Sequence, residues 1–179
     1  MHRNVGAVKT ELRTARLVGT IPTVAHTGDL ATLWDDDRVT VTLGGKRSRE
    51  VVEQMVDRWQ RHWNEHGFGP LVWRDAGTGQ FVGWCGLQWT AVAGKPAIEL
   101  LYGIAAERWG EGLATEASQE VLRWADDELH LDELVCFTLT TNVASRNVMQ
   151  KCGFTYGRGI EHAGLPHVLY RRDVSSGRG

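Results

Sequence analysis

The chain has 179 residues, a hydrophobic content of 42% and a formal net charge of −2 at neutral pH. This size allows one globular domain with a substantial core, and the weak charge gives no basic field for binding nucleic acid or an acidic membrane. Three cysteines without C-x-x-C spacing indicate reduced thiols, and no apolar run approaches the roughly 18 residues of a membrane helix. We therefore expect a soluble, cytoplasmic protein with a single domain over residues 11–173, a loose start over residues 1–10 and a flexible tail over residues 174–179.

The first part of the chain combines a strand with a short helix. Residues 11–22 have a strand-like pattern, and residues 25–34 can form a helix that ends at the acidic run Asp35-Asp36-Asp37. We interpret the three acids as a solvated turn, and attraction of an amine-bearing substrate is the alternative.

A longer amphipathic helix is predicted over residues 49–66, after the suitable N-cap Ser48. Its last turn contains His62-x-x-Glu65-His66, a spacing that could hold zinc because residues four apart share a helix face. The alternative is a polar helix end, where the dipole favours imidazolium. We favour the polar helix end and predict no metal, because no second cluster of metal ligands supports the pair.

The second part of the chain alternates strands and helices. Together with the strand near the start, this order predicts a mixed α/β sheet. Turns are expected at residues 75–79, 91–96 and 161–166. The strand patterns cover residues 71–74, 81–89, 98–104, 133–140, 154–159 and 167–172, and the helix patterns cover residues 112–127 and 143–151.

A glycine loop joins the apolar strand Ile98–Ile104 to the next helix. Gly110 and Gly112 allow the backbone to approach a ligand closely, and the first N–H groups of a helix have no intrahelical partner. Phosphate oxygens suit such a place, although a helix can also begin after glycine simply because the chain turns. Neither the Rossmann nor the Walker spacing fits, because five residues separate the strand from Gly110 and no Lys-Ser or Lys-Thr follows Gly112.

The segment Trp109–Ala114 resembles the acyl-CoA pyrophosphate loop of the GNAT N-acetyltransferase superfamily. Tryptophan replaces the usual Gln or Arg at the first position, as is common in the branch resembling the ribosomal-protein N-terminal (alanine/serine) acetyltransferases. The resemblance continues in Asn142–Val148 and Lys151–Phe154, and upstream in Leu43-Gly44-Gly45. It implies an α/β (α+β) fold with a mostly antiparallel central sheet of about seven strands, splayed at the acyl-CoA site, and about four helices. It also implies acetyl-CoA as co-substrate.

The resemblance implies which residues hold acetyl-CoA. The amides ahead of the helix would bind the diphosphate, and the strand that precedes the loop would pair with the pantetheine arm and offer the N–H of Ile104 to the thioester carbonyl. Asn142 would bind a pantetheine amide, with a simple turn residue as the alternative. The expected acyl-CoA site consists of Tyr102, Ile104, Trp109, Gly110, Glu111, Gly112, Leu113, Ala114, Thr115, Asn142, Ser145 and Asn147.

Two residues are candidates for proton transfer. Glu99 interrupts an apolar strand where family members often carry a base, and the alternative is an edge glutamate that faces solvent. Many family members protonate the CoA thiolate with a tyrosine, but the corresponding position here is Met149. The resemblance then implies Ser145 as the hydroxyl donor, with a capping role as the alternative.

The acceptor side is less constrained. His162 and His167 flank the last expected loop and are candidates for contact with the acceptor, although surface histidines are common. Of eight tryptophans, we assign most to packing and a few to the lining of a cavity. Protein N-terminus, amino acid, polyamine and aminoglycoside all remain open as acceptors.

The expected function is therefore transfer of an acetyl group from acetyl-CoA to a primary amine by direct attack in a ternary complex. Its partners would be acetyl-CoA and the amine, and the resemblance also allows a homodimer. The alternative is a catalytically silent acyl-CoA-binding regulatory protein, which the missing tyrosine makes plausible.

Overall fold

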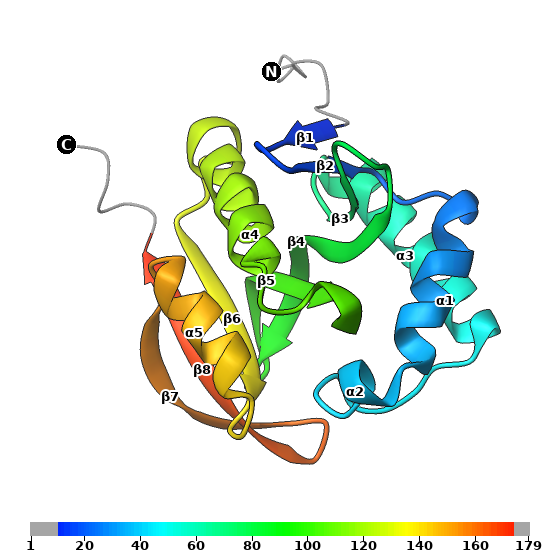
Figure 1. The fold of residues 1–179 in the computed structure, drawn as a ribbon. Helices are drawn as coiled ribbons and strands as arrows, with labels where there is room; N and C mark the ends of the chain where they lie inside the picture. Colours follow the sequence, from blue (N-terminus) through cyan, green and yellow to red (C-terminus); the bar gives the residue numbers. More distant parts are fainter. Residues whose placement is uncertain (1–10, 174–179) are drawn as a thin grey trace.

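The computed structural model describes residues 11–173, which form one eight-stranded sheet and five α-helices (Figure 1). The expected loose start and flexible tail lie outside the described residues. The strands are β1 (Glu11–Arg13), β2 (Leu17–Thr20), β3 (Pro70–Asp75), β4 (Phe81–Val92), β5 (Lys95–Ile104), β6 (Glu133–Leu139), β7 (Thr155–His162) and β8 (Leu165–Asp173). The helices are α1 (Thr27–Asp35), α2 (Asp37–Thr40), α3 (Arg49–His66), α4 (Leu113–Trp124) and α5 (Val143–Lys151).

The sheet has the order β1-β2-β3-β4-β5-β6-β8-β7, and every neighbouring pair except β5 and β6 is antiparallel. β5 and β6 are parallel and share a single registered pair, Glu99 with Val135. The two strands therefore separate beyond that pair, which leaves the C-terminal half of β5 without a strand partner on this side. This confirms the predicted mixed, mostly antiparallel sheet with a splay at its centre.

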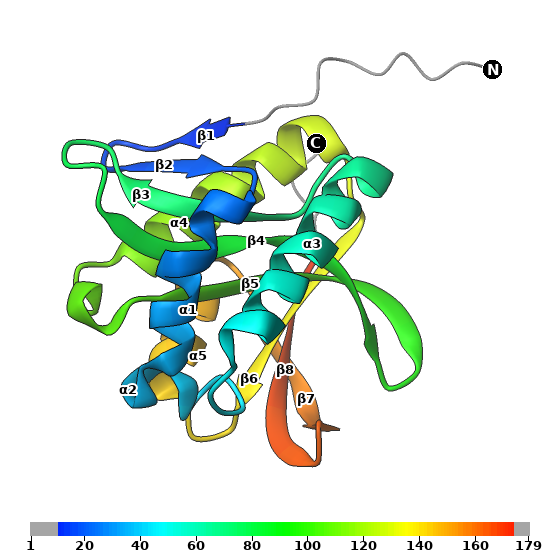
Figure 2. The ribbon, with the colours of Figure 1, turned by 90° about the vertical axis from the view of Figure 1, so that its right-hand side faces the viewer.

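Helices cover both faces of the sheet. α4 and α5 lie on one face, and α1 and α3 lie on the other (Figure 2). Because side chains alternate along a strand, β5 contributes to both layers: Leu100 belongs to the core beneath α4, and Leu101 packs against the core beneath α1 and α3. No helix in residues 11–173 has the length and apolar composition needed to cross a membrane.

Several local features differ from the sequence predictions. The predicted strand over residues 11–22 is two antiparallel strands, β1 and β2, so the sheet has eight strands rather than about seven. The acidic run ends α1 as predicted, but Asp36 then accepts a hydrogen bond from the N–H of Arg38 and caps the short helix α2. Its neighbours Asp35 and Asp37 pair with Lys46. This extra helix gives five α-helices rather than about four.

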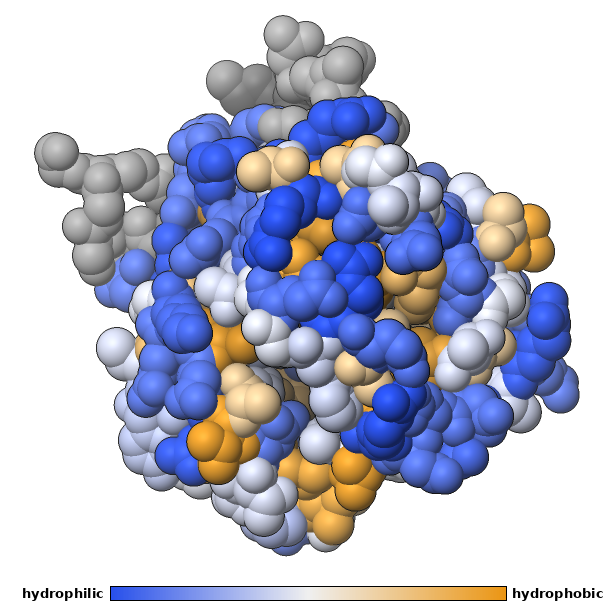
Figure 3. Space-filling model, in the orientation of Figure 1, coloured by the Kyte–Doolittle hydropathy of each residue, from blue (hydrophilic) through white to orange (hydrophobic). Residues whose placement is uncertain are grey.

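The two expected long turns are tighter than predicted. β4 and β5 are joined by Ala93 and Gly94, with φ of 51° and 76°, and β7 and β8 by Ala163 and Gly164, with φ of 51° and 73°. Positive φ at both central residues matches the twist of a two-residue hairpin turn, so the strands extend to the turn itself. Figure 3 shows that the face carrying α4 and α5 is mostly hydrophilic, with apolar residues visible near the start of α5 and at the tip of the β7–β8 hairpin.

Candidate active site

The glycine loop forms a concentrated group of amide donors at the start of α4. Gly110 and Gly112 have φ of 79° and 78°, a left-handed conformation that favours glycine, and Gly112 is the N-cap of α4. Among residues 11–173, no backbone carbonyl or side chain accepts from the N–H groups of Gly110 to Thr115. Leu113 is buried and anchors the helix start in the core. These residues fit a diphosphate, because they offer adjacent amide donors and the positive end of a helix dipole. We call this segment the amide cradle.

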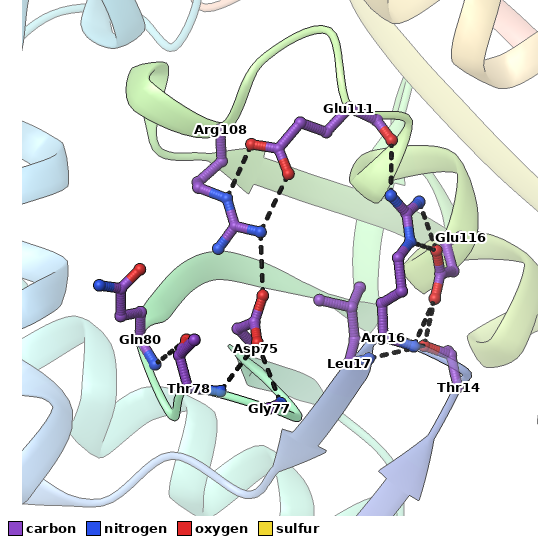
Figure 4. Close-up of polar contacts among 10 residues, drawn as sticks. All are labelled: Thr14, Arg16, Leu17, Asp75, Gly77, Thr78, Gln80, Arg108, Glu111 and Glu116. Atoms are coloured by element: carbon purple, nitrogen blue, oxygen red, sulfur yellow. Dashed lines mark hydrogen bonds and ion pairs between the residues drawn. The ribbon is translucent and has the colours of Figure 1, made fainter.

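Two glutamates beside the amide cradle would repel an anion if they were unpaired. Glu116, in the first turn of α4, accepts from the Nε of Arg16 at 2.6 Å and from the hydroxyl of Thr14 at 2.5 Å (Figure 4). Burial alone would raise the pKa of Glu116, but these two hydrogen bonds lower the pKa overall. Arg16 also donates to the backbone carbonyl of Glu111 at 3.0 Å. The turn between β1 and β2 therefore neutralises one acid and holds the loop in place.

Arg108 neutralises the second acid. Its Nε donates to the carboxylate of Glu111 at 2.8 Å, and its Nη2 donates to Asp75 at 3.1 Å (Figure 4). The hydrogen bond from Arg108 lowers the pKa of Glu111. Asp75 is fixed in turn by the N–H groups of Gly77 and Thr78, each at 3.0 Å. The side chain of Glu111 is thus held by Arg108, which offsets its negative charge beside the amide cradle.

The contacts of Trp109 show how a tryptophan fits at the first position of the loop. Although the residue is 50% exposed, its Nε1 donates to the carbonyl of Ile104 at 2.8 Å and ties the loop to the end of β5. The N–H of Ala105 donates to Val82 on β4, and neighbouring residues of a strand alternate in direction. The N–H groups of Ile104 and Tyr102 therefore point away from β4, toward the splay.

A pair of hydroxyl groups connects β5 with α5. The hydroxyl of Tyr102 lies 2.8 Å from the Oγ of Ser145 and donates to the Ser145 carbonyl at 3.1 Å. Burial raises the pKa of Tyr102 well above its ordinary value, so the phenol remains protonated. Met149, at the position where many family members carry a tyrosine, is fully buried in the core.

Asn142 forms the cap that positions Ser145. Its Oδ1 accepts from the N–H of Ser145 at 3.1 Å, and its Nδ2 donates to the Oγ1 of Thr138 at 3.1 Å. Each polar atom of Asn142 therefore already binds the protein, in an N-capping role for α5. Asn147 lies exposed on the same helix.

Glu99 lies at the last point where β5 and β6 still pair. Its side chain is 9% exposed, and the Nε2 of Gln88 donates to it at 3.4 Å from the adjacent position of β4. Burial raises the pKa of Glu99 to about 7. A carboxylate with this pKa can both hold and release a proton near neutral pH.

His162 and His167 lie together, away from the amide cradle. Their rings are 5.4 Å apart, and both contact the ring of Phe137 on β6. Burial, followed by the influence of His167, lowers the pKa of His162. The structure thus brings the two predicted acceptor residues to one another.

His62, the first histidine of the helical pair, is held by backbone groups. The ring of His62 accepts from the N–H of Trp89 at Nε2, 3.0 Å away, which leaves the Nδ1 proton to donate to the carbonyl of Phe68 at 2.7 Å. The ring of His66 lies 4.5 Å away. Since both nitrogens of His62 already bind the protein, a metal would have to break one of these bonds. In residues 11–173, no three His, Cys, Asp or Glu side chains gather as a metal site requires.

This geometry agrees with the comparison to known families. The family profile described as Acetyltransferase (GNAT) domain matches residues 16–155. The chain belongs to the GNAT acetyltransferase family. As a member of this family it is an acyltransferase that uses acetyl-CoA.

Two individual proteins are similar to this chain in sequence. Uncharacterized protein YkkB of Bacillus subtilis (strain 168) is 30% identical over 142 residues, 78% of this chain and 81% of that protein. The FsC-acetyl coenzyme A-N(2)-transacetylase of Aspergillus fumigatus is 36% identical over 96 residues, 50% of this chain and 40% of that protein.

Solved structures show the same fold. The acetyltransferase from Agrobacterium tumefaciens str. C58 superposes with a TM-score of 0.80 at 22% identity, over 96% of this chain and 99% of that one. RimL, a ribosomal L7/L12 alpha-N-protein acetyltransferase, has a TM-score of 0.74 at 15% identity, over 91% of this chain and 97% of that one. This chain therefore shares its fold with a member of the ribosomal-protein acetyltransferase branch.

The sequence did not reveal the residues that brace the amide cradle. Arg16, Arg108 and Asp75 lie outside the loop motif and meet it only through the fold. The one available signal was indirect: Glu111 inside the anion-binding motif and Glu116 just after it each require a cation nearby.

Proposed function

We propose that this acetyltransferase transfers its acetyl group to a primary amine by direct attack in a ternary complex. The observation that carries the proposal is the continuity between two sets of amides. The N–H groups of Tyr102 and Ile104 face the splay, and β5 leads from them into the amide cradle. One extended molecule with amides in its arm and a diphosphate farther along could bind both sets at once.

The donor side is held by backbone groups. The amide cradle would bind the diphosphate of acetyl-CoA, and the open edge of β5 would pair with the pantetheine amides. Acetyl-CoA supplies the thioester-activated acetyl group. The N–H of Ile104 would donate to the thioester carbonyl and stabilise the negative charge that develops there.

Glu99 is the proposed base. An alkylammonium has a pKa near 10 and must lose a proton before it can attack, and the Glu99 carboxylate can accept that proton directly or through water. Gln88 orients the carboxylate by the hydrogen bond described above. Burial without a cationic partner is costly for a carboxylate, which supports a functional rather than a structural reason for its position.

The Tyr102 and Ser145 hydroxyls are the proposed donors to the departing thiolate. Because the phenol of Tyr102 can donate to the Ser145 carbonyl, the Oγ proton of Ser145 is available for another acceptor. This pair would take the proton-donating role of the tyrosine that many family members carry at the position of Met149. The silent-binder alternative rested on that missing tyrosine, so a second source of hydroxyl groups weakens it.

The names of related proteins support an amine acceptor. The Aspergillus relative is an N(2)-transacetylase, and RimL acts on an alpha-amino group of a ribosomal protein. For the donor, the structure of the fold neighbour MccE in complex with acetyl-CoA and AMP supports acetyl-CoA.

Two measurements test the proposal. Calorimetry should show that the purified protein binds CoA, and free thiol should appear when acetyl-CoA is mixed with a panel of primary amines. Binding of CoA without thiol release for any amine would favour the silent binder. An absence of CoA binding would overturn the role of the amide cradle.

A further inference from the structure

A second site lies on the opposite face of the sheet from α4. A cavity of about 420 Å³ opens between α1, α3 and strands β4 and β5. Gln88 lines it, and Gln88 is the residue that hydrogen-bonds Glu99. An amine delivered to Glu99 from this side would therefore have the rest of its molecule in the cavity. We call it the tryptophan cavity.

Three indole rings form one wall of the tryptophan cavity. Trp34 and Trp84 stack at 6.3 Å with an interplanar angle of 13°, and Trp59 lies 5.5 Å from Trp84 at 48°. Gly103, on β5, makes room for this arrangement: a Cβ at that position would lie 2.8 Å from the Trp84 ring. Such a wall suits a flat, apolar group.

The polar groups of the tryptophan cavity are mainly donors. Arg47 lies over the Trp34 ring at 4.6 Å, and Arg58 projects from α3. Neither guanidinium pairs with a carboxylate among the described residues, whereas Arg16, Arg108 and Arg172 all do.

Two indole donors of the wall are enclosed by the protein. The Nε1 groups of Trp34 and Trp84 are buried and have no hydrogen-bond acceptor among residues 11–173, and the two residues are only 4% and 5% exposed. A ligand in the cavity does not reach these N–H groups, so recognition of an anion rests on Arg47 and Arg58. His62 does not add to this set, because both of its nitrogens bind backbone groups.

We infer that the tryptophan cavity selects a small amine that also carries an anionic group, carboxylate or phosphate, beside an aromatic ring. The ring would pack on the three indoles, the anion would bind Arg47 and Arg58, and the amine would face Glu99. Polyamines and aminoglycosides fit poorly, because two unpaired guanidinium groups repel a polycation. The inference rests on the proposed function for the role of Glu99, but the recognition of the anion can be measured by binding alone.

Four ligands separate the contributions of ring and anion. Phenylalanine carries ring, amine and carboxylate; phenylethylamine lacks the carboxylate; alanine lacks the ring; and the phosphonate analogue of phenylalanine replaces the carboxylate. We call phenylalanine and its phosphonate analogue the ring acids, and binding is measured by calorimetry with and without CoA. The tighter-binding ring acid should bind at least about tenfold more tightly than phenylethylamine, because one charge-assisted hydrogen bond contributes that much. Alanine should bind more weakly than phenylalanine.

Matched variants locate the effect. Arg58→Gln should reduce the preference for phenylalanine or its phosphonate over phenylethylamine by about threefold or more, since it removes one of the two charges, keeps a polar side chain and leaves Arg47 in place. Arg61→Gln is the control, because Arg61 is exposed on the same helix and does not line the cavity. Arg61→Gln should retain the wild-type preference.

The outcomes distinguish the two proposals. Arg58-dependent binding of either ring acid supports the inference, even if no thiol is released and the proposed function fails. Equal binding of phenylethylamine and the ring acids, binding of none of them, or an unchanged preference in Arg58→Gln would overturn it. A further outcome is equally efficient thiol release with phenylethylamine and with the ring acids. That result would support acetyl transfer but would overturn the inference that the cavity selects an anionic group.

Discussion

The amide cradle and the tryptophan cavity would recognise their proposed ligands in opposite ways. The cradle consists of consecutive main-chain groups, Gly110 to Thr115, and the side chains near it serve to hold and neutralise the loop. The cavity consists of side chains from α1, α3, β4 and β5, together with Arg47 from the segment before α3. The comparison teaches that the proposed donor site depends on backbone conformation, whereas the proposed acceptor site depends on side-chain identity. Substitutions in the two regions should therefore affect different quantities.

Glu99 is hydrogen-bonded to Gln88 of the tryptophan cavity, and its replacement should have the largest effect. We expect Glu99→Gln to lower kcat by about 100-fold or more, the usual range for loss of a general base. The affinity for CoA should stay within about twofold of wild type, because that affinity comes from the amide cradle. Steady-state thiol release and calorimetry check the two parts. Unchanged turnover would remove Glu99 from the mechanism.

The pH profile separates a base from a structural carboxylate. Burial raises the pKa of Glu99 to about 7, so the carboxylate is protonated below that pH and ionised above it. Only the ionised form accepts a proton, and the pH dependence of kcat/KM reports groups of the free enzyme. The value of kcat/KM should therefore rise with pH up to about 7 and then level off. Glu99→Gln should lose this rise. A wild-type rise that persists in the variant would assign it to another group.

Gly112 tests whether the cradle depends on backbone conformation. Gly112→Ala places a Cβ at φ of 78°, and its nearest neighbour would be Arg16 at 3.9 Å, so the cost is conformational rather than steric. A left-handed alanine costs about 1 kcal/mol or slightly more, which should weaken CoA binding about five- to tenfold.

The matched control is Gly94→Ala, in the β4–β5 turn at φ of 76°. Gly94→Ala should lower thermal stability and leave CoA affinity unchanged, whereas Gly112→Ala should bind CoA more weakly. Equal CoA affinity in the two variants would show that the cradle tolerates the change in conformation.

The same contrast explains which parts could be predicted from sequence. The bounds of α3 and α5 agree with their helical periodicity, and Ser48 caps α3 as predicted, because these features depend on neighbours within one turn. The glycine loop was recognisable for the same reason. Its conformation is determined by consecutive residues, and Gly110 and Gly112 have the positive φ that their type suggests.

Features that depend on distant contacts could not be predicted. Arg16 and Glu116 are 100 residues apart in sequence, and only the pairing of β1 with β2 brings Arg16 to α4. The tryptophan cavity likewise required the packing of two helices on two strands, although the abundance of tryptophan suggested that some would line a cavity. The split of the first strand was missed because its turn has no glycine or proline to mark it.

The smallest predicted effect comes from a brace of the cradle. Arg108→Gln leaves the carboxylate of Glu111 without its cation, next to the site proposed for a diphosphate. The amides themselves remain, so CoA affinity should fall only about threefold, in line with a screened ion pair near the surface. Calorimetry at low and high salt should show the loss shrinking as salt rises. The control is Arg123→Gln, which breaks the pair with Glu120 on α4, away from the loop, and should leave affinity unchanged. If Arg108→Gln bound CoA as tightly as wild type at low salt, Glu111 would not need neutralising, and the cradle would depend on its backbone alone.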